Sequence, residues 1–170
     1  MGARNPRVEN EIISYLPRLR RFARSLTRDA ADADDLVQMT LERAIARLDQ
    51  WRDGTRLDSW MYRIMKNAWI DEVRFRQRRD TRFAPEEAGA AVGREDPEFD
   101  KRIRAMSVEQ AMETLPEDQR LAVALVLVEG LSYKEAAAVM DVPMGTLTSR
   151  LARGRAALEA ILNPQREASS

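Results

Sequence analysis

The sequence predicts an all-α protein made of two small helical domains. Along most of the chain, apolar residues recur every three or four positions, which is the period of an amphipathic helix. Residues 83–104 break this pattern with Ala, Gly, Pro and Glu, a composition typical of a flexible acidic linker. We therefore expect a first domain over 1–82, a linker over 83–104, a second domain over 105–163 and a tail over 164–170.

The composition excludes several kinds of chemistry. The 170-residue chain has no Cys and no His, which removes disulfides, thiol nucleophiles, imidazole catalysis and the usual zinc sites. No apolar run approaches the ~20 residues of a membrane span, and the N-terminus lacks the hydrophobic stretch of a signal peptide. We expect a cytoplasmic protein with no metal, no cofactor, no small-molecule substrate and no membrane insertion.

The first domain is expected to begin with an amphipathic helix whose apolar side runs from Val8 to Leu26, with arginines on its other sides. Pro17 lies within it. Because proline removes a backbone donor and clashes with the preceding turn, we expect a kink or a break there. The acidic run Asp32–Asp35 opens the next helix, where the helix dipole favours negative charge, and this helix continues to about Asp49.

A third helix is expected from about Asp58, after a turn at Asp53-Gly54. Its apolar residues cover more than one face, so most of this helix should be buried. Trp60 and Trp69 stand beside arginines, a combination that can stack against unpaired bases, although tryptophans at such spacing are more often core residues. The helix runs into the basic stretch 74–82, RFRQRRDTR, which suits a phosphate backbone.

The second domain is expected to regain helicity near Ile103. A further helix starts with Pro116 in its first turn and ends at Gly130. Its core face includes Leu121 and Leu125. These two helices lead into the segment that is most informative about function.

Two short helices with a tight turn between them follow Gly130. Ser132 and Glu135 are in capping-box register, so a helix should begin at Tyr133, and Pro143 should stop it. Gly145 then opens a second helix with its leucines facing inward. This arrangement is a helix-turn-helix pattern.

The outward face of the second helix has small, hydroxyl-bearing or basic side chains and no carboxylate. A recognition helix enters the major groove of DNA by its N-terminal turns, where small polar residues approach base edges and arginines reach phosphates or guanines. From this stretch alone, an alanine-rich helical hairpin with solvated arginines explains the pattern equally well. The residues available for DNA contact are Thr146, Thr148, Ser149, Arg150, Arg153 and Arg155.

Charge is unevenly distributed along the chain. The 28 basic and 28 acidic residues cancel, and a zero average counts against a nucleic-acid binder. However, residues 74–82 carry five arginines against one aspartate, and residues 86–100 carry six carboxylates against one arginine. Separate basic and acidic segments are compatible with binding DNA at chosen places and a protein elsewhere.

Together these segments resemble the extracytoplasmic-function (group IV) RNA polymerase sigma factors. The resemblance is carried by DADDLVQMTLERAIARLDQW (32–51), RLDSWMYRIMKNAWIDEVRFRQRR (56–79) and LPEDQRLAVALVLVEGLSYKEAAAVMDVPMGTLTSRLARGRAAL (115–158). It is specific, because unrelated stretches occur in the right order and at the right separation. It implies that the first domain is sigma region 2 and the second is sigma region 4.

The resemblance also implies which residues meet each partner. Region 2 would bind bacterial core RNA polymerase through Asp32, Asp34, Asp35, Leu36 and Gln38. It would melt and read the −10 promoter element, with a loop around residues 67–69 holding a flipped base, through Trp60, Tyr62, Arg63, Asn67, Ala68, Trp69, Asp71 and Arg74. Region 4 would read the −35 element through Thr146, Thr148, Ser149, Arg150 and Arg153.

The resemblance implies regulation as well. The acidic linker would thread the RNA channel of the polymerase, and an anti-sigma factor would hold the protein inactive until a stress signal arrives. With neither Cys nor His in the chain, the signal must be sensed elsewhere.

Two other interpretations remain open at the level of sequence. A helix-turn-helix repressor or activator acting without polymerase would bind palindromic duplex sites as a dimer, but it leaves Asp32–Asp35 and the aromatic-basic helix unexplained. An enzyme could use the same carboxylates as Mg²⁺ ligands for phosphoryl chemistry, although carboxylates at a helix start are usually caps or solvated charge. We therefore predict no enzymatic activity.

Overall fold

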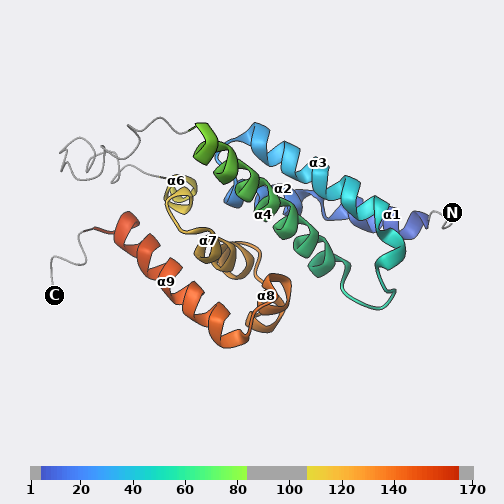
Figure 1. The fold of residues 1–170 in the computed structure, drawn as a ribbon. Coiled ribbons are helices and arrows are strands. Elements are labelled where there is room, and N and C mark those ends of the chain that lie inside the picture. Colours follow the sequence, from blue (N-terminus) through green and yellow to red (C-terminus); the bar gives the residue numbers. More distant parts are fainter. Residues whose placement is uncertain (1–4, 84–106, 165–170) are drawn as a thin grey trace.

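The computed structural model describes residues 5–83 and 107–164, and every regular element in them is helical (Figure 1). This confirms the all-α prediction. The N-terminal half contains α1 (Pro6–Ser14), α2 (Leu16–Leu26), α3 (Ala30–Ala46), the 3-10 turn η1 (Leu48–Gln50) and α4 (Leu57–Phe83). The C-terminal half contains α6 (Val108–Glu113), α7 (Glu117–Val123), the π-helical turn η3 (Ala124–Val128), α8 (Tyr133–Met140) and α9 (Met144–Leu162).

The expected linker lies outside the described residues except for Phe83, which ends α4. In the described ranges, no helix has both the length and the apolar character needed to cross a membrane.

The break expected at Pro17 is present. The first helix ends at Ser14, and α2 starts at Leu16 with the proline in its first turn. Proline is tolerated there because first-turn amides have no partner within the helix. The break lets the two helices change direction while Val8, Ile12, Leu19, Phe22 and Leu26 all remain buried.

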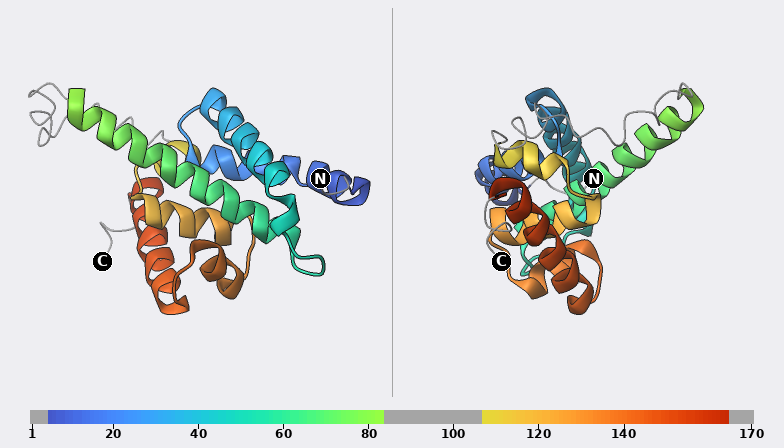
Figure 2. Two further views of the ribbon diagram at one scale, coloured as in Figure 1. Left: turned by 45° about the vertical axis from the view of Figure 1, so that its right-hand side comes forward. Right: turned by 90° about the vertical axis from the view of Figure 1, so that its left-hand side faces the viewer.

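The α3 helix begins just before the acidic run, because Asp29 caps it by accepting a hydrogen bond from the backbone of Asp32 at 2.8 Å. The α4 helix starts at Leu57, close to the expected Asp58, and packs against α3, α8 and α2. From residue 74 to residue 81 every side chain is exposed. This end of α4 extends beyond the other helices (Figure 2).

The helix-turn-helix begins with the predicted capping box. The backbone N–H of Glu135 donates to the Ser132 hydroxyl at 3.1 Å, and the Glu135 carboxylate accepts from the backbone of Ser132 at 3.3 Å. The first helix, α8, ends at Met140 and is capped by Asp141, whose φ of 57° is left-handed. Pro143 then caps α9, which starts at Met144, one residue before the expected Gly145.

The helices that precede this motif begin slightly later than expected. The helix expected near Ile103 lies partly outside the described residues, and within them α6 begins after Ser107, which forms a capping box with Gln110. Pro116 occupies the cap of α7, immediately before its first turn. Gly130 follows the π-helical turn with a φ of 71°, a conformation that glycine adopts at little cost.

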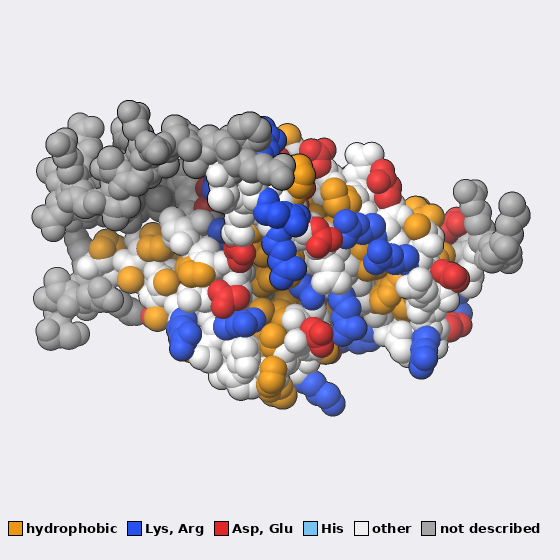
Figure 3. All heavy atoms as spheres, in the orientation of Figure 1, with side chains coloured by type: hydrophobic (Ala, Val, Ile, Leu, Met, Phe, Trp, Pro, Cys, Tyr) orange, Lys and Arg blue, Asp and Glu red, His pale blue; other side chains and the backbone are white. Residues whose placement is uncertain are grey.

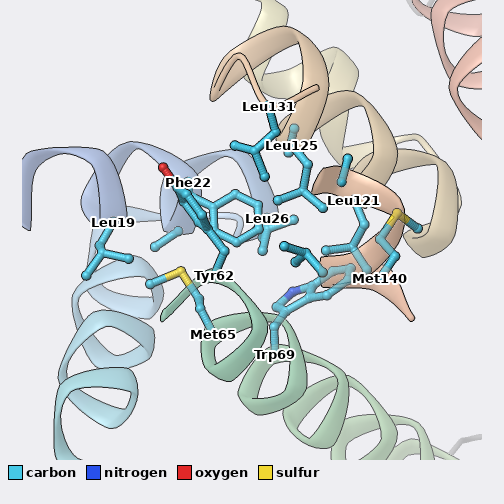
Figure 4. Close-up of a cluster of buried hydrophobic side chains, with 14 of the residues drawn as sticks. Leu19, Phe22, Leu26, Tyr62, Met65, Trp69, Leu121, Leu125, Leu131 and Met140 are labelled. Atoms are coloured by element: carbon cyan, nitrogen blue, oxygen red, sulfur yellow. The ribbon is translucent and has the colours of Figure 1, made fainter. Parts of the chain in front are cut away.

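The two halves share one hydrophobic core (Figure 4). Side chains from α2 and α4 meet side chains from α7, η3 and α8, and Phe22 packs edge-on against Tyr62 with ring centroids 5.1 Å apart. In the C-terminal half, α9 crosses α7 at Gly154, where an added Cβ would lie 2.7 Å from a methyl carbon of Val123. Close approach of these two helices therefore depends on glycine at this position.

We predict that Gly154→Ala destabilises the protein by about 1–3 kcal/mol, because the new methyl group overpacks a β-branched, rotamer-restricted Val123. Gly145→Ala is the matched control: an added Cβ there meets nothing within 4 Å. It should be neutral or stabilising by up to about 1 kcal/mol. Urea unfolding followed by circular dichroism measures both variants, and equal midpoints for the two would contradict the packing argument.

Candidate functional site

The recognition face of α9 points to solvent, as the sequence predicted. Thr148, Ser149 and Arg153 are exposed, and Thr146 is half-buried. The Thr148 hydroxyl donates to the carbonyl of Met144 in its own helix at 2.8 Å, which leaves its oxygen free to accept. Within the described residues Arg153 has no partner, so this surface combines hydroxyl groups with a free guanidinium.

Arg150 differs from the other predicted −35 residues. It is half-buried, and its Nε lies 3.3 Å from a carboxylate oxygen of Asp118 on α7. The ion pair ties the recognition helix to the rest of its domain. In this structure Arg150 therefore supports α9 instead of presenting a free charge.

The residues predicted for −10 recognition lie along α4 and divide into two groups. Asn67, Asp71 and Arg74 are exposed, and Asp71 accepts from Arg43 of α3 at 3.3 Å. The second group faces inward: Tyr62, Ala68 and Trp69 are each at most 4% exposed, while Trp60 is half-buried. Arg63 lies at the edge and donates to the carbonyl of Ala138 on α8 at 2.7 Å.

The expected loop around residues 67–69 is wrong. These residues lie in the middle of α4, because no proline or glycine interrupts the helix and two of the three side chains pack inward. The loop nearest to the start of this helix is the segment 51–56, which contains the exposed Gly54 at a φ of 91°.

The residues predicted for polymerase binding lie at the start of α3. Asp34, Asp35 and Gln38 are exposed, whereas Asp32 is half-buried and pairs with Arg76 of α4 at 3.3 Å. Leu36 is only 6% exposed, so its expected direct contact with a partner is not available in this state. The helix turns it toward the core because its neighbours Ala33, Val37 and Thr40 share that buried side.

A cavity of about 500 Å³ lies beside this cluster, between α3, α4 and α7. Its wall combines apolar side chains such as Leu36 and Trp69 with charged ones such as Arg76 and Arg120. Among the residues described, no three acidic side chains lie close enough together to hold a metal ion.

Arg120 is one of the residues that sequence reasoning missed. Its guanidinium donates to three carbonyls, those of Leu26 at 3.1 Å, Glu113 at 2.7 Å and Leu115 at 3.0 Å. Burial lowers its pKa, and its charge lies 5.8 Å from the centre of the Trp69 ring. This side chain therefore joins the end of α2 to the C-terminal half.

Glu129 is the second missed residue. Its side chain is fully buried, and Arg21 donates to both of its oxygens at 2.9 and 2.8 Å. The Tyr62 hydroxyl donates to one of the same oxygens at 2.7 Å. Burial and this hydrogen bond raise the pKa of Tyr62, and the hydrogen bond to Glu129 raises the pKa of Arg21. Both partners belong to the N-terminal half, so this carboxylate connects the two halves.

A third charged cluster lies near the helix-turn-helix, at the contact between the N-terminal and C-terminal halves, which we call the seam. Arg56 bonds the Asp58 carboxylate at 3.2 and 2.8 Å and also bonds Glu135 of α8. Arg18 contributes a second cation to Asp58 at 3.2 Å. Basic side chains are also prominent on the face that carries α4, with acidic ones interspersed (Figure 3).

Comparison with known proteins identifies the two halves. Residues 12–66 match the family model described as the Sigma2 domain of PhyR, and residues 105–158 match the one described as Sigma-70, region 4. The chain is 36% identical over 155 residues to the ECF RNA polymerase sigma factor EcfG of Rhodopseudomonas palustris (strain TIE-1), which covers 91% of this chain and 84% of that relative.

Two more comparisons agree. The chain is 34% identical over 146 residues to the ECF RNA polymerase sigma-E factor of Escherichia coli (strain K12), covering 79% of this chain and 76% of the relative. It also resembles the sigma factor RpoE from Bartonella quintana, solved in complex with the anti-sigma factor NepR, with a TM-score of 0.75 and 32% identity over 92% of this chain and 97% of that one.

The helical fold, the helix-turn-helix and these matches define the class: the protein is an RNA polymerase sigma factor, which directs transcription initiation. Within that class, the chain belongs to the extracytoplasmic-function (ECF) family. The resemblance seen in the sequence is confirmed.

Acid should weaken the seam at Asp58. Burial opposes ionisation of this carboxyl, but hydrogen bonds from Arg56 and the Ser59 backbone outweigh burial and lower its pKa. Because the pKa of Asp58 is lower in the folded state than in the unfolded state, its ionised form stabilises the folded state at pH values above the ordinary carboxyl pKa of about 4. This stabilisation is lost as the pH falls through the pKa of the folded state. We predict that the urea midpoint falls less steeply below about pH 4 in Asp58→Asn than in the wild type. Parallel curves for the two proteins would contradict this assignment.

Proposed function

We propose that this sigma factor uses three separate surfaces. Exposed residues of α3, chiefly Asp34, Asp35 and Gln38, bind core RNA polymerase, and Leu36 supports that surface from beneath. The α4 helix melts and reads the −10 element, and the outward face of α9 reads the −35 element. The observation that carries the proposal is the coexistence, in one chain, of a solvent-facing recognition helix and an aromatic-basic helix. We assign no catalytic role to any residue.

The proposed domain boundaries follow from these surfaces. Region 2 occupies 1–82 and region 4 occupies 105–163, with 83–104 as linker and 164–170 as tail. The sites act where polymerase and promoter DNA are found, so the proposed location is the cytoplasm.

Both halves must separate for this function. A compact chain of 170 residues is about 40 Å across, from the usual scaling of radius with length. Elements near positions −10 and −35 are about 25 base pairs apart, or about 85 Å at the rise of duplex DNA. A molecule whose two halves stay packed together, which we call the closed state, cannot contact both promoter elements at once. The 23 residues from 84 to 106 allow separation, since an extended chain of that length spans up to about 80 Å.

The closed arrangement also fits control by an anti-sigma factor. The similar Bartonella quintana protein was solved in complex with one. We propose that an anti-sigma partner holds this chain inactive, and that release of the partner is the regulated step.

Run-off transcription is the direct test of the proposed function. The assay combines this chain with purified core bacterial RNA polymerase and promoter fragments from the genome that encodes the chain. RNA synthesis should start at a defined set of promoters. A footprint on palindromic duplex DNA without polymerase, combined with no initiation, would favour the repressor interpretation instead.

Two substitutions test the assignment of the promoter elements. We predict that Arg153→Ala lowers initiation roughly 5- to 150-fold on promoters with an intact −35 element, because one specific arginine contact is worth about 1–3 kcal/mol. Scrambling that element should abolish the difference from wild type. Transcription rates on matched promoter pairs measure the effect.

Asn67→Ala should show the converse pattern, with a loss that depends on the −10 element and persists when the −35 element is scrambled. Each variant is therefore the control for the other. If both variants lost activity equally on every promoter, neither residue would have the element-specific role proposed here.

A further inference from the structure

We propose that Glu129 is the latch of a self-inhibited state, in which region 4 covers part of the −10 surface of region 2 without any partner protein. This inference rests on the proposed function, because inhibition here means that promoter DNA cannot reach Tyr62 and Trp69 of α4. It goes beyond control by an anti-sigma factor, since the latch lies within the chain itself.

The first argument is the surroundings of the carboxylate. A buried charge is costly unless it is paired and hydrogen-bonded, and the Glu129 side chain is fully buried. The side-chain donors recorded for it in the described part of the chain, Arg21 and Tyr62, lie in the other half, 108 and 67 positions away in sequence. The carboxylate therefore receives its side-chain hydrogen bonds only when the two halves are in contact, because the donors belong to the other half.

The second argument is the backbone that presents this residue. The chain leaves α7 through the π-helical turn η3, and the backbone N–H of Glu129 donates to the carbonyl of Ala124, five positions earlier, at 2.9 Å. Such turns are rare and occur often at functional sites. The turn and the left-handed Gly130 that follows it end the helix where its last side chain faces α2 and α4.

The third argument is what closure hides. Tyr62, which belongs to the predicted −10 set, donates its hydroxyl to the latch at 2.7 Å, and Trp69 from the same set is 4% exposed. Arg63 is held by the carbonyl of Ala138 at 2.7 Å. The same groups cannot stack on or bind unpaired bases while they make these contacts. Closure and promoter binding through these residues exclude each other.

The fourth argument is reversibility. The Arg21 side chain is 53% exposed, so water already reaches one end of the latch. When the halves separate, both charges regain hydration, whereas apolar groups at the same point would resist exposure. A charged pair at the centre of the seam therefore makes opening less costly than an all-apolar seam would.

The absence of cysteine makes the test direct. Ala31→Cys on α3 and Ala156→Cys on α9 are exposed positions in the two halves, and nitroxide labels at both report the distance between them by pulsed electron paramagnetic resonance. This labelled chain is compared with versions that also carry Glu129→Gln or Arg21→Gln. The matched control is Glu159→Gln, an exposed glutamate on α9 whose side chain makes no contact across the seam within the part of the chain that the structure describes.

We expect one short distance in the labelled parent and in the control. Both latch variants should add a long-distance population, with the open-to-closed ratio raised at least about fivefold. Affinity for single-stranded DNA carrying the −10 element should rise by the factor by which the open fraction grows, because Tyr62 and Trp69 can be reached only in the open form. Circular dichroism should show unchanged helix content in all variants.

Two results would overturn the latch. The first is a distance distribution that is the same in the latch variants and the control. The second is a longer distance with no gain in affinity for single-stranded −10 DNA, which would make Glu129 a structural contact only. If even the parent chain failed to bind core polymerase, the proposed function would fail, while the distance measurement would still decide whether Glu129 holds the two halves together.

Discussion

The contact between the two halves is centred on the buried carboxylate of Glu129. Glu129 lies where α2, α4 and the end of η3 meet, and it takes hydrogen bonds from Arg21 and Tyr62. Around it, apolar side chains from both halves form one core (Figure 4). Arg120 and Arg56 complete the seam at its two ends by bonding groups in the opposite half. Each half thus contains polar groups whose hydrogen-bonding partners lie in the other half.

This arrangement explains why one chain can hold two binding surfaces without using both at once. The recognition face of α9 is open to solvent, and Arg153 is unpaired among the residues that the structure describes, whereas Tyr62 and Trp69 of α4 are covered. The closed state therefore exposes the proposed −35 surface and hides part of the proposed −10 surface. A sigma factor of this kind needs an opening step before both elements can be engaged, and any partner that favours one state controls the other by population shift.

Local features of the fold could be predicted from the sequence, because local chemistry determines them. The break at Pro17, the capping box at Ser132 and the end of α8 before Pro143 each follow from residues within a few positions of one another. The long-range contacts could not be predicted. Arg21 and Glu129 are 108 positions apart, and helical periodicity says nothing about which buried faces meet. The burial of Tyr62 and Leu36 was missed for this reason. The helical course of residues 67–69 follows from the local pattern, and only the family resemblance implied a loop there.

The most direct test of this account is the distance between α3 and α9 in the free protein and in its complex with core polymerase and promoter DNA. Spin labels on the two helices, in an otherwise cysteine-free chain, report both states. The account predicts one short distance in the free protein and an increase of several tens of ångströms in the complex, since about 85 Å separates the two promoter elements. The same short distance in an active promoter complex would contradict it.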